Sequence, residues 1–230
     1  MSTIKKKELG IGLFLMVTFI AVMIVIFMPT TEDGNALDYL DNLYNSISKG
    51  SAYYIPKVEH HVEELGSEVV VLNLKMGDSE TAQKAEVLFQ RAGVTTAVEN
   101  DNLMVNGDLE VIFKACLGDA ESAYHNRKED FTERYGVSAR AALHSWWQTL
   151  KAMEKDLNRQ KLFTAAQLTH TVQAKTVECA YNYYGIEAQA IKDRWGTVLF
   201  SLVFYVLYTI WYGYAIMYIF EGLGFELASH

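Results

Sequence analysis

The chain has 230 residues, with 28 acidic and 20 basic side chains and a formal net charge of −8 at pH 7. Nucleic-acid binding needs a basic surface, so this balance argues against a nucleic-acid partner. Half of the residues are hydrophobic, and they gather in one run near each end, with a polar, acidic stretch between. We therefore expect an α+β membrane protein in which two transmembrane helices flank a water-facing domain.

The first hydrophobic run extends from Gly10 to Met28 and contains no charged residue. Its length suits the hydrocarbon core of a bilayer, which needs about 20 apolar residues. A signal peptide has a shorter apolar region of about 7–15 residues and ends at a small-x-small cleavage site. This run ends in Phe27-Met28-Pro29 instead. We expect an uncleaved anchor over 10–29, after a tail of residues 1–9.

The second hydrophobic run extends from Trp195 to Phe220, again without a charge. Trp195 and Tyr218 lie near its ends, where amphipathic rings favour the membrane interfaces. Inside lipid, backbone polar groups must pair within their own segment, so both runs are expected to be helices. The second transmembrane helix is predicted over 195–220, followed by a tail of residues 221–230.

The charges that flank the two runs predict the orientation in the membrane. Lys5, Lys6 and Lys7 precede the first run, whereas residues 29–50 after it hold four acidic residues and one lysine. The positive-inside rule then places both tails in the cytoplasm and the middle domain outside it, in the periplasm for a bacterial inner membrane. Basic residues just before the second run favour the opposite orientation, but the first span usually dominates.

The part of the middle domain over 30–125 shows an α/β pattern. A β-branched run over 68–76 predicts a buried central strand. A helix capped by Asp78 or the next residue follows, then a hairpin around 100–102 and a helix capped by Asp108. The order strand, helix, strand, strand, helix is most of a split βαβ unit, a topology that carries no function by itself.

The segment over 126–194 is predicted to be helical throughout. A helix capped by Ser138 carries an apolar stripe at helical spacing. A second helix is expected from about Leu162 to Tyr184, with Gly185 as the position where it would kink. No proline separates it from the second span, so we expect nearly continuous helix into the membrane. The stripe consists of Leu143, Trp146, Trp147, Leu150, Met153 and Leu157.

Two adjacent histidines are the first candidate for chemistry. His60 and Glu64 are four residues apart on a predicted helix and so share a face. Adjacent His60 and His61, however, point about 100° apart, and the H-E-x-x-H order of zinc proteases is absent. We interpret the segment as a solvated, charged helix face and predict no metal and no cofactor.

Cys116 and Cys179 are the only cysteines. In an oxidising compartment, a pair of cysteines permits one disulfide, whereas the alternative is two buried, small apolar side chains. Trp146 and Trp147, together with His144, are a candidate ligand platform. Such a pair is more often one core tryptophan and one surface or interface tryptophan, and we adopt that interpretation.

The second span carries hydroxyl groups at positions that share one helix face. Hydroxyls in hydrocarbon seek hydrogen-bond partners, so this face is predicted to contact other transmembrane helices. Gly10 and Gly12 in the first span are small enough to allow a close helix approach. The hydroxyl-bearing residues are Ser201, Tyr205, Tyr208, Thr209 and Tyr212.

No nucleophile motif, phosphate-binding loop or dinucleotide fingerprint is present in the sequence. We therefore expect a non-catalytic structural or accessory subunit of a larger inner-membrane complex, such as a respiratory or energy-converting assembly. Its partners would be the lipid bilayer and either other integral membrane subunits or further copies of the chain.

The order of span, extracytoplasmic α/β domain, long helices, span and short tails resembles that of the polysaccharide chain-length regulators. The resemblance lies in this plan alone, and it implies a self-assembling membrane scaffold. A third alternative is a ligand-sensing membrane protein that acts through a partner, because the tail over 221–230 is too short for a signalling domain. The last alternative is an enzyme that binds a metal ion or a small ligand.

Overall fold

A computed structural model of the protein describes residues 4–29 and 34–225. The described chain is mostly helical, with one small, three-stranded antiparallel sheet. It forms two compact units. We call residues 1–48 and 188–230 the terminal unit, and residues 49–187 the central unit.

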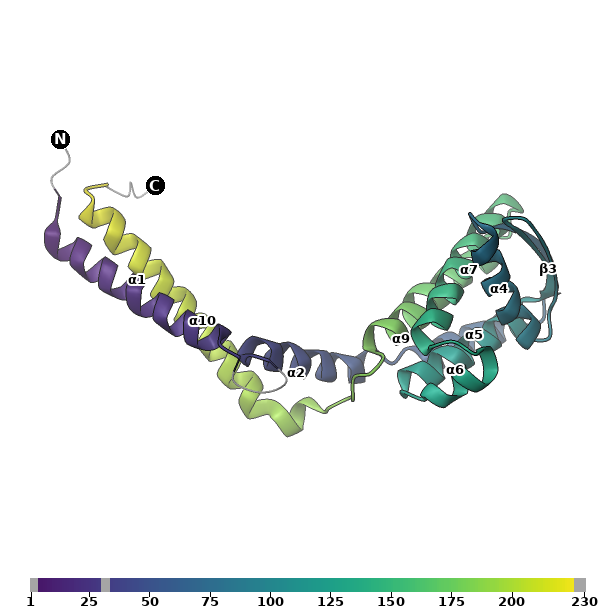
Figure 1. The fold of residues 1–230 in the computed structure, drawn as a ribbon, viewed down its shortest axis with the longest axis horizontal. Coiled ribbons are helices and arrows are strands. Elements are labelled where there is room, and N and C mark those ends of the chain that lie inside the picture. The colour runs from purple at the N-terminus through teal and green to yellow at the C-terminus, as the bar shows by residue number, and fades with distance from the viewer. Residues whose placement is uncertain (1–3, 30–33, 226–230) are drawn as a thin grey trace. The chain divides into compact units, whose positions relative to one another are not determined.

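The terminal unit is built on two long antiparallel helices. These are α1 (Lys6–Phe27) and α10 (Ile191–Gly222), which lie side by side (Figure 1). Both are long and apolar enough to cross a membrane, and very little of either is buried inside the protein. At 1.5 Å per residue, α1 is roughly 33 Å long, close to the thickness of a bilayer core. Helix α2 (Ala36–Ser51) follows α1 and ends in the central unit.

The sheet of the central unit has the split order that the sequence predicts. Its strands are β1 (Val69–Lys75), β2 (Thr95–Glu99) and β3 (Asn102–Asp108), in the order β1-β3-β2. Helix α4 (Ser79–Arg91) connects β1 to β2, so the two strands that it joins are separated by β3. The predicted hairpin is also present, with Asn100 in its turn at φ +58°.

The prediction that β1 is a buried central strand is wrong. Its side chains alternate, so that Leu72 is fully buried while Val69 and Val71 are 71% and 65% exposed. The central strand is β3, because it alone pairs on both sides. Side chains of α7 (Ala139–Arg159) and of Gln160, the residue that follows it, cover the outer edge of β1. Asp156 accepts a hydrogen bond from the Asn73 amide (2.9 Å), and the Gln160 side chain donates to a β1 carbonyl (2.9 Å).

The remaining helices of the central unit begin where capping residues predict. Asp78, Asp108 and Ser138 each accept a hydrogen bond from a backbone amide in the first turn of the helix that follows. A side-chain oxygen there satisfies a donor that has no partner within the helix. The helices are α3 (Ile55–Leu65), α5 (Leu109–Tyr124), α6 (Lys128–Tyr135) and α7 (Ala139–Arg159).

The last helical stretch of the central unit contains a π-helical segment and then stops short of α10. Helix α8 (Phe163–Val172) continues through a π segment (Gln173–Val177) into α9 (Glu178–Tyr183). Residues 184–190 are not helical, so the predicted near-continuous helix into the second span is wrong. Gly185 adopts φ +88°, a conformation that glycine reaches without a steric penalty, and this ends the helix.

One hydrophobic core runs through the central unit from α3 to α9. At its centre the buried carboxylate of Asp119 on α5 accepts hydrogen bonds from Trp146 (2.7 Å), Tyr135 (2.5 Å) and Arg134. Burial raises the pKa of Asp119, and these donors partly offset that effect. The network ties α5 to α6 and α7, so the helices on either side of residue 125 share one core.

The chain enters and leaves the central unit at one place. Lys49, only 3% exposed, donates from its ammonium group to the carbonyl of Ile186 (2.5 Å). The Asn126 side chain donates to the same carbonyl (3.2 Å) and accepts from the Gly185 amide (2.7 Å). The Tyr124 hydroxyl bonds to the Lys49 carbonyl. Burial lowers the pKa of Lys49. Entry and exit are thereby held together by contacts within the unit.

Candidate functional site

The two long helices of the terminal unit pack closely because of glycine. Gly12 of α1 lies against the backbone of α10, where a Cβ atom would come within 2.6 Å of the Ile219 nitrogen. The same kind of approach occurs at Gly222, whose neighbour is Leu9. Gly10 has no such neighbour. Small residues at a helix contact let the backbones approach, as membrane helix pairs require.

Aromatic rings extend this contact along α10. The ring of Phe19 on α1 stacks on Tyr208 with 5.4 Å between centroids and lies 5.2 Å from Tyr212. The Trp211 indole donates a hydrogen bond to the Leu15 carbonyl at 3.1 Å. An N–H group that would otherwise face apolar surroundings is therefore paired within the protein.

Some residues of the predicted hydroxyl face of α10 contact other parts of the chain, and the others are exposed. Tyr208 faces α1 through Phe19, and the Ser201 hydroxyl shares a hydrogen bond of 2.6 Å with the Tyr44 hydroxyl of α2. Thr209 donates to the carbonyl of Tyr205 in its own helix (2.7 Å). This part of the predicted face is occupied by contacts within the chain.

Tyr205 and Tyr212 are the two tyrosines of the predicted face with large exposed fractions. Tyr205 is 62% exposed and Tyr212 is 43% exposed. Within residues 4–29 and 34–225, neither hydroxyl makes a hydrogen bond, and only the rings contact other side chains. The two residues are seven apart on α10 and so lie on the same side of the helix, two turns apart.

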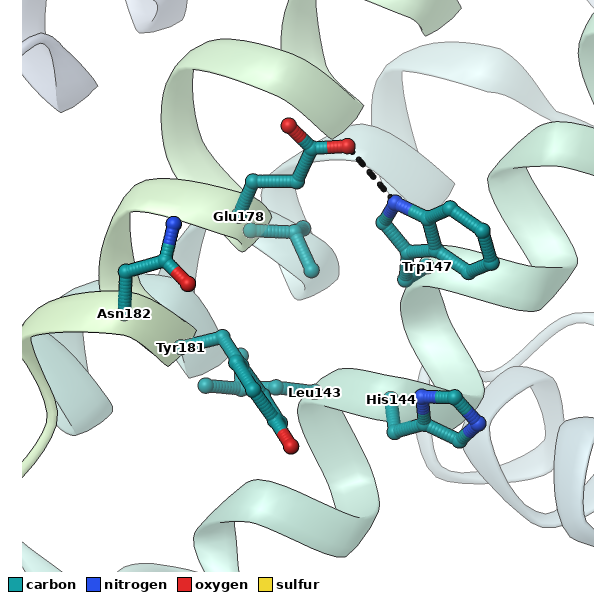
Figure 2. A pocket seen from close by; sticks show the side chains of 7 residues that line it. Leu143, His144, Trp147, Glu178, Tyr181 and Asn182 are labelled. Atoms are coloured by element: carbon teal, nitrogen blue, oxygen red, sulfur yellow. Dashed lines mark hydrogen bonds between the residues drawn. The ribbon is translucent and has the colours of Figure 1, made fainter.

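One groove of the central unit lies between α7 and the helical stretch that ends in α9. Its volume is about 330 Å³. Figure 2 shows the side chains arranged around an open centre, with Trp147 and His144 from α7 facing Glu178, Tyr181 and Asn182. The lining consists of Leu143, His144, Trp147, Val177, Glu178, Tyr181 and Asn182.

The π segment directly precedes the groove residues of α9. A π turn inserts one extra residue, which rotates the residues after it relative to a regular α-helix. Glu178, Tyr181 and Asn182 are spaced three and four apart and therefore share one face. Val177 is the buried apolar residue of this wall. Segments of this kind occur frequently at functional sites.

Polar groups in the groove are only partly paired. The Trp147 indole donates to one carboxylate oxygen of Glu178 at 2.7 Å, and the His144 ring lies nearly parallel to the indole, 6.2 Å away. In the described part of the chain the side chains of His144, Tyr181 and Asn182 have no hydrogen-bond partner. These side chains are therefore available to contact a ligand. Among the described residues that line the groove, no nucleophile is hydrogen-bonded to a base.

The tryptophan pair is divided as predicted into one core and one surface residue. Trp146 is fully buried, its indole bonded to Asp119 and its ring edge-on to Phe89 at 6.0 Å. Trp147 is partly exposed in the groove. The sequence offered Trp147 and His144 as a ligand platform only as the disfavoured alternative, and the structure places both residues on one wall of the groove. Glu178 and Tyr181 were missed, because nothing in a sequence pairs two helices separated by about thirty positions.

The histidine segment of α3 is a solvent-facing surface. His60 lies 3.4 Å from Glu64, and both side chains are well exposed. His61 and Glu64 line a second, shallow groove against α8. Within the residues that the structure describes, no group of three or more His, Cys, Asp or Glu side chains is placed to hold a metal ion.

Both cysteines are free thiols in the structure. Cys116 lies in the core on α5, and burial raises the pKa of its thiol. Cys179 is half-buried on α9, and its thiol donates to the Ala52 carbonyl at 3.0 Å. Burial raises the pKa of this thiol too, and Lys49 partly offsets the shift. Neither thiol is activated as a nucleophile, because the reactive form is the thiolate.

Comparison of the chain with protein-family models found no match, and comparisons with curated proteins and with solved structures likewise found none.

Proposed function

We propose that the protein is a two-span membrane protein that serves as a non-catalytic accessory subunit of a larger inner-membrane complex. The apolar surface of α1 and α10 supports the membrane location, because side chains such as Phe14, Val17, Phe200 and Leu207 are each more than half exposed. In water, so large an apolar surface would drive aggregation, whereas in lipid it is solvated.

The orientation proposed for this anchor places the central unit outside the cytoplasm. Lys5, Lys6 and Lys7 support it, since basic residues near a first span stay on the cytoplasmic side. Alkaline phosphatase fused after Gly50 of the chain should then be active, because the enzyme needs an oxidising compartment. An inactive fusion combined with a fluorescent reporter that glows at the same position would reverse the orientation.

Two exposed tyrosines of α10 whose hydroxyls have no hydrogen-bond partner among the described residues support the subunit role. Tyr205 and Tyr212 lie within the apolar span, where an unpaired hydroxyl costs roughly 2–7 kcal/mol relative to water in a fully apolar medium. A neighbouring transmembrane helix with acceptor groups would satisfy both hydroxyls. Such bonds contribute on average only about 0.6 kcal/mol each in membranes, so the two residues should be changed together.

The test is a pull-down of the native assembly in mild detergent with two double variants. Tyr205→Phe/Tyr212→Phe removes only the hydroxyls, whereas Tyr205→Leu/Tyr212→Leu also removes the rings. Loss of a partner in both variants indicates that hydrogen bonds hold it, and loss in the leucine variant alone indicates ring packing. Tyr44→Phe is the matched control, because its hydroxyl already bonds within the chain.

Retention of every partner and of the native oligomeric state in both double variants would show that these residues face lipid, and the subunit proposal would fail. If the protein lost is a second copy of this chain, the assembly is a self-assembled scaffold. Loss of a different membrane protein identifies a mixed complex.

A further inference from the structure

The groove between α7 and α9 contains one formally charged side chain in its lining, that of Glu178. One of its carboxylate oxygens is held by the Trp147 indole, which orients the group, while the other has no partner among the described residues. Leu143 and Val177 are fully buried beneath the groove, so the apolar surface that it presents is that of the Trp147 and Tyr181 rings. An oriented negative charge beside accessible aromatic rings is complementary to a cation that carries an apolar body.

Two aromatic rings of the groove already lie against cationic side chains of the protein. The Lys151 ammonium lies 4.9 Å from the centroid of Trp147, and the Arg140 guanidinium carbon lies 5.9 Å from that of Tyr181. The negative faces of aromatic rings favour such positions. Neither Lys151 nor Arg140 lines the groove, so the charge of Glu178 is not neutralised from within.

We propose that this groove binds a small organic cation, an ammonium group on a compact apolar body. The ammonium lies against the free oxygen of Glu178, and the apolar body packs against the Trp147 and Tyr181 rings (Figure 2). The volume of about 330 Å³ is at the small end of ligand pockets, so it suits one ring or a short alkyl chain. The proposal depends on the central unit alone and is independent of the subunit role.

The test uses full-length protein in mild detergent and fluorine NMR of para-fluorobenzylamine, whose signal broadens on binding. Para-fluorobenzyl alcohol and para-fluorobenzoate serve as the neutral and anionic probes of similar shape, and detergent without protein corrects for partitioning. The variants are Glu178→Gln, which keeps the shape of the side chain, and Tyr181→Leu, which removes a ring. Glu99→Gln on the exposed end of β2 is the control.

We expect the amine to bind more tightly than the alcohol and the benzoate. Its affinity should fall roughly tenfold or more in Glu178→Gln, because a charged hydrogen-bond partner is lost. It should fall less in Tyr181→Leu and remain unchanged in Glu99→Gln. Equal binding of the three probes, no effect of Glu178→Gln, or no binding of the amine to the unaltered protein at millimolar concentration would each overturn the proposal.

Discussion

The buried carboxylate of Asp119 offers a sharp test of how the central unit is held together. Asp119→Ala removes the acceptor for three donors, those of Arg134, Tyr135 and Trp146. The Trp146 indole is fully buried and would be left unpaired, which costs about 1–3 kcal/mol. The Arg134 side chain is 41% exposed and can turn to water, so its loss contributes little.

The desolvation of the carboxylate itself opposes this loss, because burial of the charge is unfavourable and raises its pKa. We therefore expect Asp119→Ala to lower the free energy of unfolding by about 1–2 kcal/mol, and Asp119→Asn, which keeps an acceptor, by about half as much. Pulse proteolysis of the full-length protein in urea and mild detergent measures both values.

A double-mutant cycle separates the Asp119–Trp146 bond from packing. Trp146→Phe removes the indole donor and part of the ring, so its own effect includes lost core contacts. If the bond matters, the double variant should be less destabilised than the sum of the single variants by about 1–2 kcal/mol. A coupling energy near zero, or an Asp119→Ala variant as stable as the unaltered protein, would refute the reasoning.

Three further outcomes can be measured on the same protein. Gly12→Val should lower the melting temperature in detergent, because overpacking of a helix contact costs about 1–3 kcal/mol. Gly10→Val is the control, since a side chain there meets no neighbour, and it should leave the melting temperature unchanged. Equal effects of the two variants would contradict the close approach of α1 and α10 at Gly12. Hydrogen bonds lower the pKa of Asp108, and the largest effect comes from the Ser67 hydroxyl. The ionised carboxylate therefore stabilises the fold at pH values above the usual aspartate pKa. This stabilisation is lost as the pH falls through the lowered pKa. Asp108→Asn should therefore destabilise the protein at neutral pH and progressively less as the pH falls below the usual aspartate pKa of about 4. A deficit that stays constant on acidification would contradict the assignment. Elemental analysis of the purified protein should find no stoichiometric zinc, iron or copper, and one tightly held metal lost in His60→Ala would contradict the interpretation of α3 as a solvated surface.

Local signals in the sequence predicted the ends and the type of most elements. A helix begins where a side chain can cap its first turn, and Asp78, Asp108 and Ser138 do so by contacts within three residues along the chain. Long uncharged runs predict helices that can span a membrane for the same reason, since their length and composition are properties of one segment. The split order of the sheet followed from the order of these elements along the chain.

Contacts between distant segments were decided only by the tertiary structure. The run over 69–75 has the same composition in a central strand as in an edge strand, and only the neighbours, β3 on one side and α7 on the other, decide which it is. The break over 184–190 depends on Asn126, whose side chain pairs with the Gly185 amide from about sixty positions away.

The same distinction applies to both candidate sites. The spacing of hydroxyls along α10 is visible in the sequence, but which of them are satisfied by α1 and α2 depends on how those helices pack. The groove likewise joins Trp147 to Glu178 across two helices, through a π segment that no periodicity reveals. Periodicity reports the face of one element, whereas the identity of the residue opposite depends on how the whole chain buries its apolar surface.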